Sequence, residues 1–129
     1  MPLEDHEFWT MTYNDDIKAV ELWWKRASAE MTGEDFKLAL EHLAEHICER
    51  SASGTLIDVR RFDFATTPEL DQWRRETIIP AYNAGGLKRF AYLLPAGADA
   101  RPGGTGETDE FLTDYFDQPE AARAWLAEA

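Results

Sequence analysis

The sequence has few cysteines and few basic residues. Its single cysteine, Cys48, cannot form a disulfide within the chain of 129 residues, which fits a reducing compartment. The 13 lysines and arginines are outnumbered by 25 aspartates and glutamates, so the formal net charge is −12. Because negative charge repels phosphate backbones and anionic lipids, we expect neither nucleic acid nor an anionic membrane surface as a partner.

Long hydrophobic segments are also absent. No run approaches the roughly 20 apolar residues that a helix needs to span a bilayer. Residues 1–9, MPLEDHEFW, contain three acidic residues and lack the apolar segment of a signal peptide. We therefore expect a cytoplasmic protein without membrane insertion.

Common catalytic and cofactor-binding signatures are missing as well. The sequence contains no CxxC pair, no Rossmann fingerprint and no recognisable Ser-His-Asp order. The glycine-rich residues 103–106 lack the G-K-[ST] ending of a phosphate-binding loop. We therefore expect no cofactor and no enzymatic activity, and we interpret residues 96–108 as a mobile surface loop.

The sequence does contain enough apolar residues for one core. Hydrophobic residues make up 44% of the chain and aromatic residues 12%, which is typical of a folded protein rather than a disordered one. The length suits a single domain. We expect this domain to span the chain, with residues 1–6 flexible.

The hydrophobic pattern predicts alternating strands and helices. Strands are expected over residues 7–13, 17–26, 55–60, 88–95 and 109–116. Helices are expected over residues 33–50, 68–84 (with an interruption at Pro80) and 119–126. The first two strands form an antiparallel hairpin, and two helical crossovers make the following strands parallel. The predicted class is α/β, with one mixed, mostly parallel sheet of about five strands and about three helices.

The order of these elements resembles a known family. The closing segment, FDQPEAARAWL, contains the most specific residues: Asp117, Glu120, Ala121, Trp125 and Leu126. Together with the early hairpin, the central strand LIDVR and the later strand KRFAYLLP, it resembles the STAS-like families. These are the anti-sigma-factor-antagonist superfamily and its CRAL-TRIO-related relatives. The resemblance implies a small STAS-like domain with a regulatory or protein-binding role.

The resemblance also implies a candidate phosphorylation site. In antagonist proteins a phosphorylatable serine lies at the N-terminus of the helix after the central strand, and Thr67, next to Thr66, has that position here. Free N–H groups at a helix N-terminus favour a phosphate. Pro68 and Glu69 depart from the family's pattern, and the alternative is that Thr67 only caps the helix.

Basic residues lie at the ends of two predicted parallel strands. Lys25 and Arg26 end the second strand. Arg60 and Arg61 follow the central strand, just after Asp58. Because parallel strands place their carboxyl ends at one edge of the sheet, these five residues predict a contact for a small anion or an acidic partner. Ordinary charge balance on exposed turns is the alternative.

Aromatic residues predict two further contacts. A pocket for a small apolar or lipid-like ligand, between the sheet and the helices, is expected to be lined by Trp24, Trp73, Phe90 and Tyr92. Trp23 points to the opposite face of its strand from Trp24, on the side of Phe8. If no helix covers that face, Trp23 and Phe8 predict an interface, with a homodimer as the first candidate.

The segment His42–His46 has the H-x-x-E-H spacing of a zinc hydrolase helix. Two histidines one turn apart can share a Zn²⁺ ion, and Glu45 has the position of a general base. Helical geometry places His42, Glu45 and His46 away from the apolar stripe of their helix. A solvated helix face is therefore the preferred interpretation, and we expect no metal.

The sequence thus predicts a non-catalytic STAS-like regulatory or interaction module that binds a protein partner or itself. A binder of a small apolar or lipid-like ligand is the first alternative, and it needs a dry pocket beneath Trp73. A metal-dependent hydrolase at His42 and His46 is the second alternative, and it needs a third protein ligand.

Overall fold

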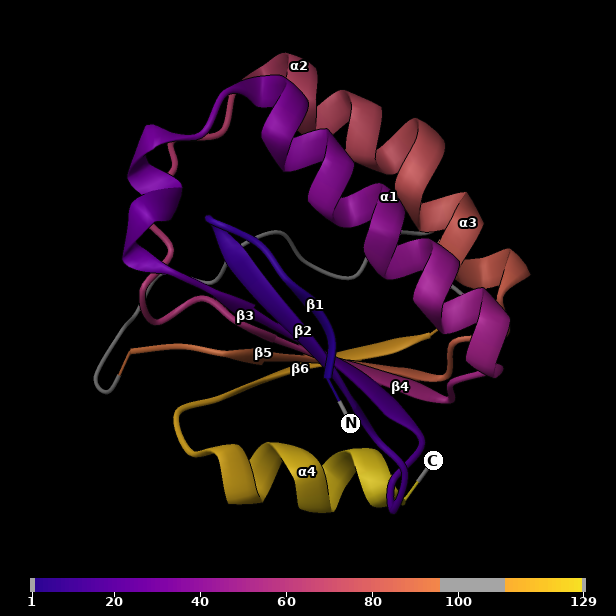
Figure 1. Cartoon of the computed structure of the whole chain (residues 1–129). Coiled ribbons are helices and arrows are strands. Elements are labelled where there is room, and N and C mark those ends of the chain that lie inside the picture. Colours follow the sequence, from indigo (N-terminus) through magenta and orange to yellow (C-terminus); the bar gives the residue numbers. More distant parts are fainter. Residues whose placement is uncertain (1, 96–110, 129) are drawn as a thin grey trace.

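In the computed structural model, which describes residues 2–95 and 111–128, the chain forms one mixed β-sheet with helices on both faces (Figure 1). The six strands of this described part follow one another across the sheet in sequence order: β1 Pro2–Asp5, β2 Trp9–Asn14, β3 Ala19–Trp24, β4 Gly54–Asp58, β5 Arg89–Leu93 and β6 Leu112–Phe116. Pairs β1–β2 and β2–β3 are antiparallel, and the remaining pairs are parallel. The predicted α/β class is confirmed. The predicted mobile loop, residues 96–108, lies outside the described residues.

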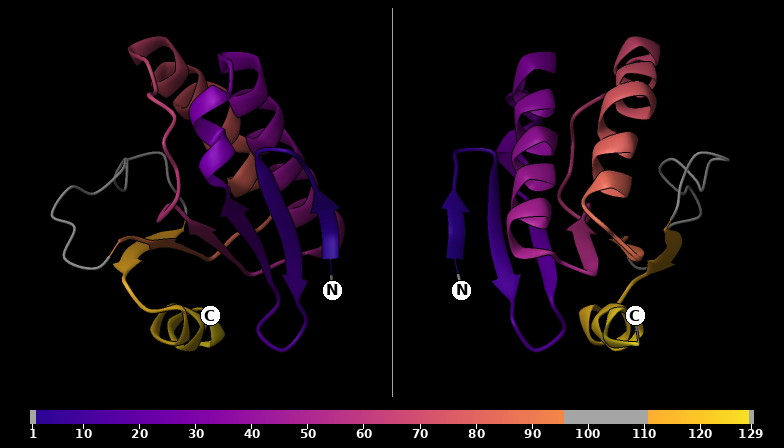
Figure 2. Two further views of the ribbon diagram at one scale, coloured as in Figure 1. Left: turned by 60° about the vertical axis from the view of Figure 1, so that its left-hand side comes forward. Right: turned by 90° about the vertical axis from the view of Figure 1, so that its right-hand side faces the viewer.

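Helices cover both faces of the sheet (Figure 2). On one face, α1, Gly33–Arg50, lies beside a helical segment made of α2, Pro68–Trp73, a π-helical turn, Arg74–Ile78, and α3, Ile79–Ala84. On the other face lies α4, Pro119–Ala127. A short 3₁₀ helix, Arg26–Glu30, comes between β3 and α1. Among the described residues, no helix combines the length and the apolar character needed to cross a membrane.

The helix boundaries have local causes. Thr32 and Asp35 form a capping box: Thr32 Oγ1 accepts from the backbone N–H of Asp35 at 3.3 Å, and the Asp35 carboxylate accepts from the backbone N–H of Thr32 at 3.0 Å. Thr67 Oγ1 caps α2 by accepting from the backbone N–H of Leu70 at 3.2 Å. Gly86, with φ of 84°, follows α3 in the left-handed region that favours glycine.

Pro80 lies at the interruption of its helix that the sequence predicted. We expected a kink or a restart before Asn83, and α3 begins at Ile79 with Pro80 in its first turn; the π-helical turn just upstream was not expected. The backbone N–H of Ile79 bonds to the carbonyl of Arg74, five residues back, and this bond makes the π-helical turn. A proline has no N–H to donate and its ring crowds the preceding turn, so a wider turn just upstream suits it.

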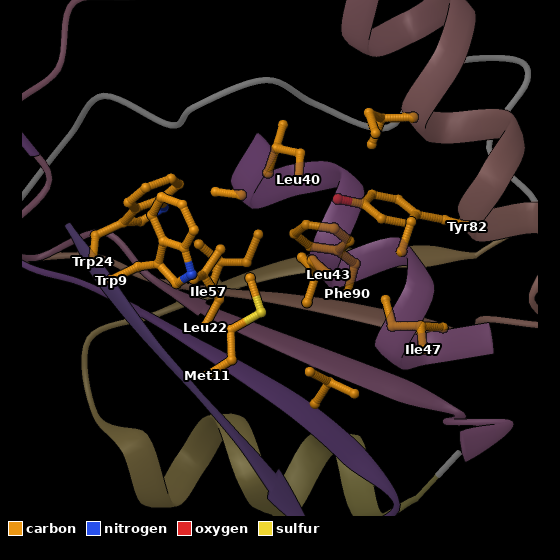
Figure 3. Packing of buried hydrophobic residues seen from close by; sticks show 14 of the residues in the cluster. Trp9, Met11, Leu22, Trp24, Leu40, Leu43, Ile47, Ile57, Tyr82 and Phe90 are labelled. Atoms are coloured by element: carbon orange, nitrogen blue, oxygen red, sulfur yellow. The ribbon is translucent and has the colours of Figure 1, made fainter. Parts of the chain in front are cut away.

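The main core lies between the sheet and the two helices on its first face (Figure 3). Leu40, Leu43 and Ile47 of α1 point toward the sheet, as the predicted apolar stripe requires. A smaller core on the opposite face joins the sheet to α4. The central strand β4 has neighbours on both edges, and all five of its residues are buried. β4 is therefore the central strand that the sequence predicted.

Strand β1 was not predicted. We expected residues 1–6 to be flexible, but Pro2–Asp5 pairs with β2, with an irregular register between Pro2 and Glu4. The chain then bends, and β2 begins at Trp9. Phe8 lies in this bend, where strand alternation does not apply, and it is buried in the main core. Its assignment to the opposite face as part of an interface was wrong.

Candidate binding site

A hollow of about 530 Å³ lies at the carboxyl ends of β3 and β4. It is lined by Thr10, Trp23, Trp24, Lys25, Arg26, Asp58, Arg60 and Arg61. Because β3 and β4 are parallel neighbours, both end at this edge, and the antiparallel β2 begins there. The structure thus brings together all five residues predicted to contact an anion or an acidic partner. We name the hollow and its lining residues the carboxyl-edge basin.

Asp58 and Arg60 neutralise each other in the basin. The Asp58 side chain is buried and accepts a hydrogen bond from the backbone N–H of Arg60 at 2.9 Å. It also accepts two bonds from the Arg60 guanidinium, at 3.0 and 3.1 Å. These bonds raise the pKa of Arg60. The pair therefore fixes the chain just after β4 and adds little net charge.

Lys25 is held by the end of strand β1. Its Nζ donates to Asp5 Oδ1 at 2.8 Å and to the backbone carbonyl of His6 at 2.7 Å. The hydrogen bond from Lys25 lowers the pKa of the exposed Asp5 carboxyl. A second cation of the basin is thus already paired within the chain.

Arg26 and Arg61 are the unpaired cations of the basin. Both side chains are exposed. Within the described ranges, neither has an ion pair or a side-chain hydrogen bond. Because Arg60 and Lys25 are compensated by their carboxylate partners, these two arginines leave the basin positive in a chain whose formal net charge is −12.

Trp23 forms part of the basin wall and is partly covered by α4. Its Nε1 donates to Thr12 Oγ1 at 3.1 Å, and Arg123 Cζ lies 5.6 Å from its ring centroid. Arg123 in turn donates two hydrogen bonds to the buried Glu21, at 3.0 and 3.1 Å. Trp23 therefore belongs partly to the smaller core, and the side chain is half-buried rather than fully presented to a second copy.

The four aromatic residues predicted to line an apolar pocket all belong to the main core or pack against it, but Trp24 makes its ring contacts with other residues than Phe90 and Tyr92 do. Trp24 packs against Phe36 and Phe62, with ring centroids 6.1 and 4.9 Å apart. Phe90 and Tyr92 contact each other elsewhere in the core, at 4.8 Å. The remaining member, Trp73, is half-buried, and its ring lies beneath the Nζ of Lys37. The buried members of the predicted pocket are therefore packed against other rings.

His42 and His46 bind a carboxylate from the unpredicted strand β1. Glu4 accepts from His42 Nδ1 at 3.0 Å and from His46 Nε2 at 2.5 Å. Arg50 Nη1 lies 3.2 Å from His46 Nδ1, so the Nε2–H tautomer of His46 satisfies both contacts. The predicted solvated face is wrong at these two positions, because β1 half-covers them; Glu45 is exposed as expected. In the part of the chain that the structure describes, no group of three or more His, Cys, Asp or Glu side chains is arranged to hold a metal ion.

Thr66 and Thr67 are exposed at the start of α2. The N-cap interpretation of Thr67 is confirmed by its hydrogen bond from Leu70. A separate hollow of about 380 Å³ beside Thr67 is lined by Glu34 and Glu69 as well as Lys37. A phosphate on Thr67 would be repelled by these two carboxylates and attracted by the Lys37 ammonium group, so the surroundings do not clearly favour it.

Sequence reasoning missed Thr10 and Asp5 at the basin. The hairpin register places Thr10 opposite Trp23. Pairing the two predicted strands residue by residue would have identified Thr10 as a neighbour of Trp23. Asp5 carried no such signal, because the four-residue strand β1 begins with a proline and shows no clear alternation. The contact between Asp5 and Lys25 depends on a strand that the pattern did not predict.

Comparisons with known proteins add no identification. No protein-family model matches the chain. Searches of curated proteins and of solved structures find no significant match either. The STAS-like resemblance therefore stays a prediction from the sequence, and a function for this chain rests on the chemistry of its basin.

Proposed function

We propose that this protein is a non-catalytic STAS-like interaction module whose carboxyl-edge basin binds an acidic segment of a partner protein. The observation that carries the proposal is a pair of exposed arginines, Arg26 and Arg61, at one hollow of a strongly acidic chain; neither has an ion-pair partner among residues 2–95 and 111–128. A guanidinium group binds a carboxylate through two parallel hydrogen bonds. Two such groups beside one hollow therefore suit a peptide with several carboxylates.

The lining of the basin favours an acidic peptide over an apolar ligand. Pockets for apolar ligands are mostly apolar and enclose the ligand, whereas four of the eight basin residues are lysine or arginine. A short acidic segment is also compatible with the net charge of −12. Charges further than about 8–10 Å away are screened at ordinary salt, so the local arginines dominate at the basin.

Binding of a labelled acidic peptide tests the proposal. Fluorescein-labelled hexaglutamate is titrated with the protein at pH 7 and about 0.1 M salt, where distant charges are screened, and the anisotropy is recorded. We expect saturable binding that weakens as salt is added, because the contacts are ionic. Replacing both arginines (R26Q/R61Q) should weaken binding about tenfold, since each lost contact contributes up to about 1 kcal/mol.

A matched control removes the same charge elsewhere. Arg75 and Lys88 are exposed and lie outside the basin lining, so R75Q/K88Q should change the affinity less than twofold. Labelled hexaglutamine reports any contact that does not need carboxylates. An equal loss in both double variants, or no binding of hexaglutamate to the unmodified chain, would refute the proposal.

A further inference from the structure

We infer that Asp5 of strand β1 is an internal competitor for the basin, because it occupies Lys25 until the carboxylates of an acidic partner displace it. This inference rests on the proposed function and concerns the regulation of the same site. Lys25 is then a third cation of the basin, available to a ligand only when its ion pair with Asp5 is broken. Three cations would then face the partner instead of two.

The geometry of Lys25 supports a reversible contact. Its Nζ lies 2.8 Å from Asp5 Oδ1 and 2.7 Å from the His6 carbonyl, so its partners are the last residue of β1 and the residue after it. The Lys25 and Asp5 side chains are 40% and 81% exposed. An ion pair this exposed to water and salt is weak, and a second carboxylate can replace the first at little cost.

Strand β1 holds Asp5 in place for this role. The adjacent residue, Glu4, is fixed to α1 by its hydrogen bonds with His42 and His46. Asp5 itself pairs with Thr10, a basin residue, in the register of β1 and β2. The carboxylate is therefore presented by an anchored strand, and its local concentration at Lys25 is high even though the contact is weak.

Competition has a defined energetic consequence. A ligand that takes Lys25 must first break the contact with Asp5, so removing the Asp5 charge should strengthen ligand binding by the amount that the pair contributes. For an exposed ion pair this corresponds to about a two- to fivefold change in affinity. The effect must also require Lys25, because Asp5 acts through that side chain.

A double-mutant cycle with labelled hexaglutamate at pH 7 tests the inference. Asp5→Asn should tighten binding about two- to fivefold. Glu7→Gln removes one negative charge from a nearby exposed residue that does not contact Lys25, and it should change the affinity less than 1.5-fold. In a Lys25→Met background, Asp5→Asn should have no larger effect than Glu7→Gln.

The outcomes separate this inference from the proposed function. If hexaglutamate binding depends on Arg26 and Arg61 but Asp5→Asn behaves like Glu7→Gln, Asp5 is not a competitor and the proposed function stands. If the Asp5→Asn effect persists without Lys25, the competition model is likewise overturned. If no binding depends on the two arginines, the proposed function and this inference both fail.

Discussion

At the scale of single residues, all three histidines of the chain lie around strand β1. His6 stacks on Trp9 with ring centroids 3.7 Å apart, and His42 and His46 bind Glu4. Burial raises the pKa of Glu4, but hydrogen bonds from the two helix histidines and from Trp9 outweigh it, so the pKa lies below its ordinary value of 4.5. The histidine motif that resembled a zinc site therefore attaches an edge strand to α1.

Glu4 should make the stability of the protein depend on pH. A lowered pKa in the folded state contributes stability that is present above pH 4.5 and is lost as the pH falls through the folded-state value. At pH 6, Glu4→Gln should lower the free energy of unfolding by about 1 kcal/mol, or Tm by about 3 °C. The Tm difference from the unmodified chain should shrink toward pH 3. Thermal unfolding followed by circular dichroism at pH 6, 5, 4 and 3 measures it.

The exposed residue Glu7 supplies the control for this measurement. Glu7→Gln removes a carboxylate from the same end of the chain, at a residue outside the contacts of Glu4 with α1. Its Tm difference from the unmodified chain should stay small over the whole pH range. A Tm difference for Glu4→Gln that is equally large at pH 3 and pH 6 would contradict the role given to the Glu4 carboxylate.

At the scale of elements, an ion pair between a buried carboxylate and a partly exposed arginine attaches α4 to the sheet. Glu21 of β3 is 4% exposed, and Arg123 of α4 donates to both of its carboxylate oxygens. The hydrogen bond between the two side chains raises the pKa of Arg123. A buried carboxylate without a partner is costly, so the protein needs Arg123 to keep Glu21 buried in its charged form.

Removing Arg123 alone should destabilise the protein more than removing both partners. Arg123→Met leaves Glu21 buried without its main partner and should lower the free energy of unfolding by about 2 kcal/mol. The double variant E21L/R123M should lose clearly less, because no unpaired charge stays behind. Urea unfolding followed by tryptophan fluorescence and circular dichroism checks both values. A double variant that loses as much as the single one would argue against this account.

The elements differ in how well the sequence predicts them. β2, β3, α1 and β4 were predicted because alternation, helical spacing and capping residues all agreed locally. β1 was missed because it is short, begins with a proline and owes its position to contacts with residues about 40 positions away in α1. The π-helical turn was missed because sequence patterns locate a proline but not the turn that accommodates it.

At the scale of the whole molecule, the basin follows from strand order. Helices cover the faces of the sheet, so the carboxyl ends of β3 and β4 at its edge are where charged turns can meet (Figure 1). The five charged residues of the basin were predictable because parallel neighbours must end together. Their pairing was not predictable. Arg60 pairs with Asp58 and Lys25 pairs with Asp5 of β1, whereas the other two basin cations, Arg26 and Arg61, have no ion-pair partner in the described part of the chain.

The most direct test of the central claim is a ¹H–¹⁵N correlation spectrum of the protein titrated with hexaglutamate. If the basin binds acidic segments, the largest shift changes should fall on the amides of residues 23–26 and 58–61, and R26Q/R61Q should need about ten times more peptide to reach the same changes. Largest changes around Arg75 and Lys88, or small changes spread evenly over the chain, would contradict the claim.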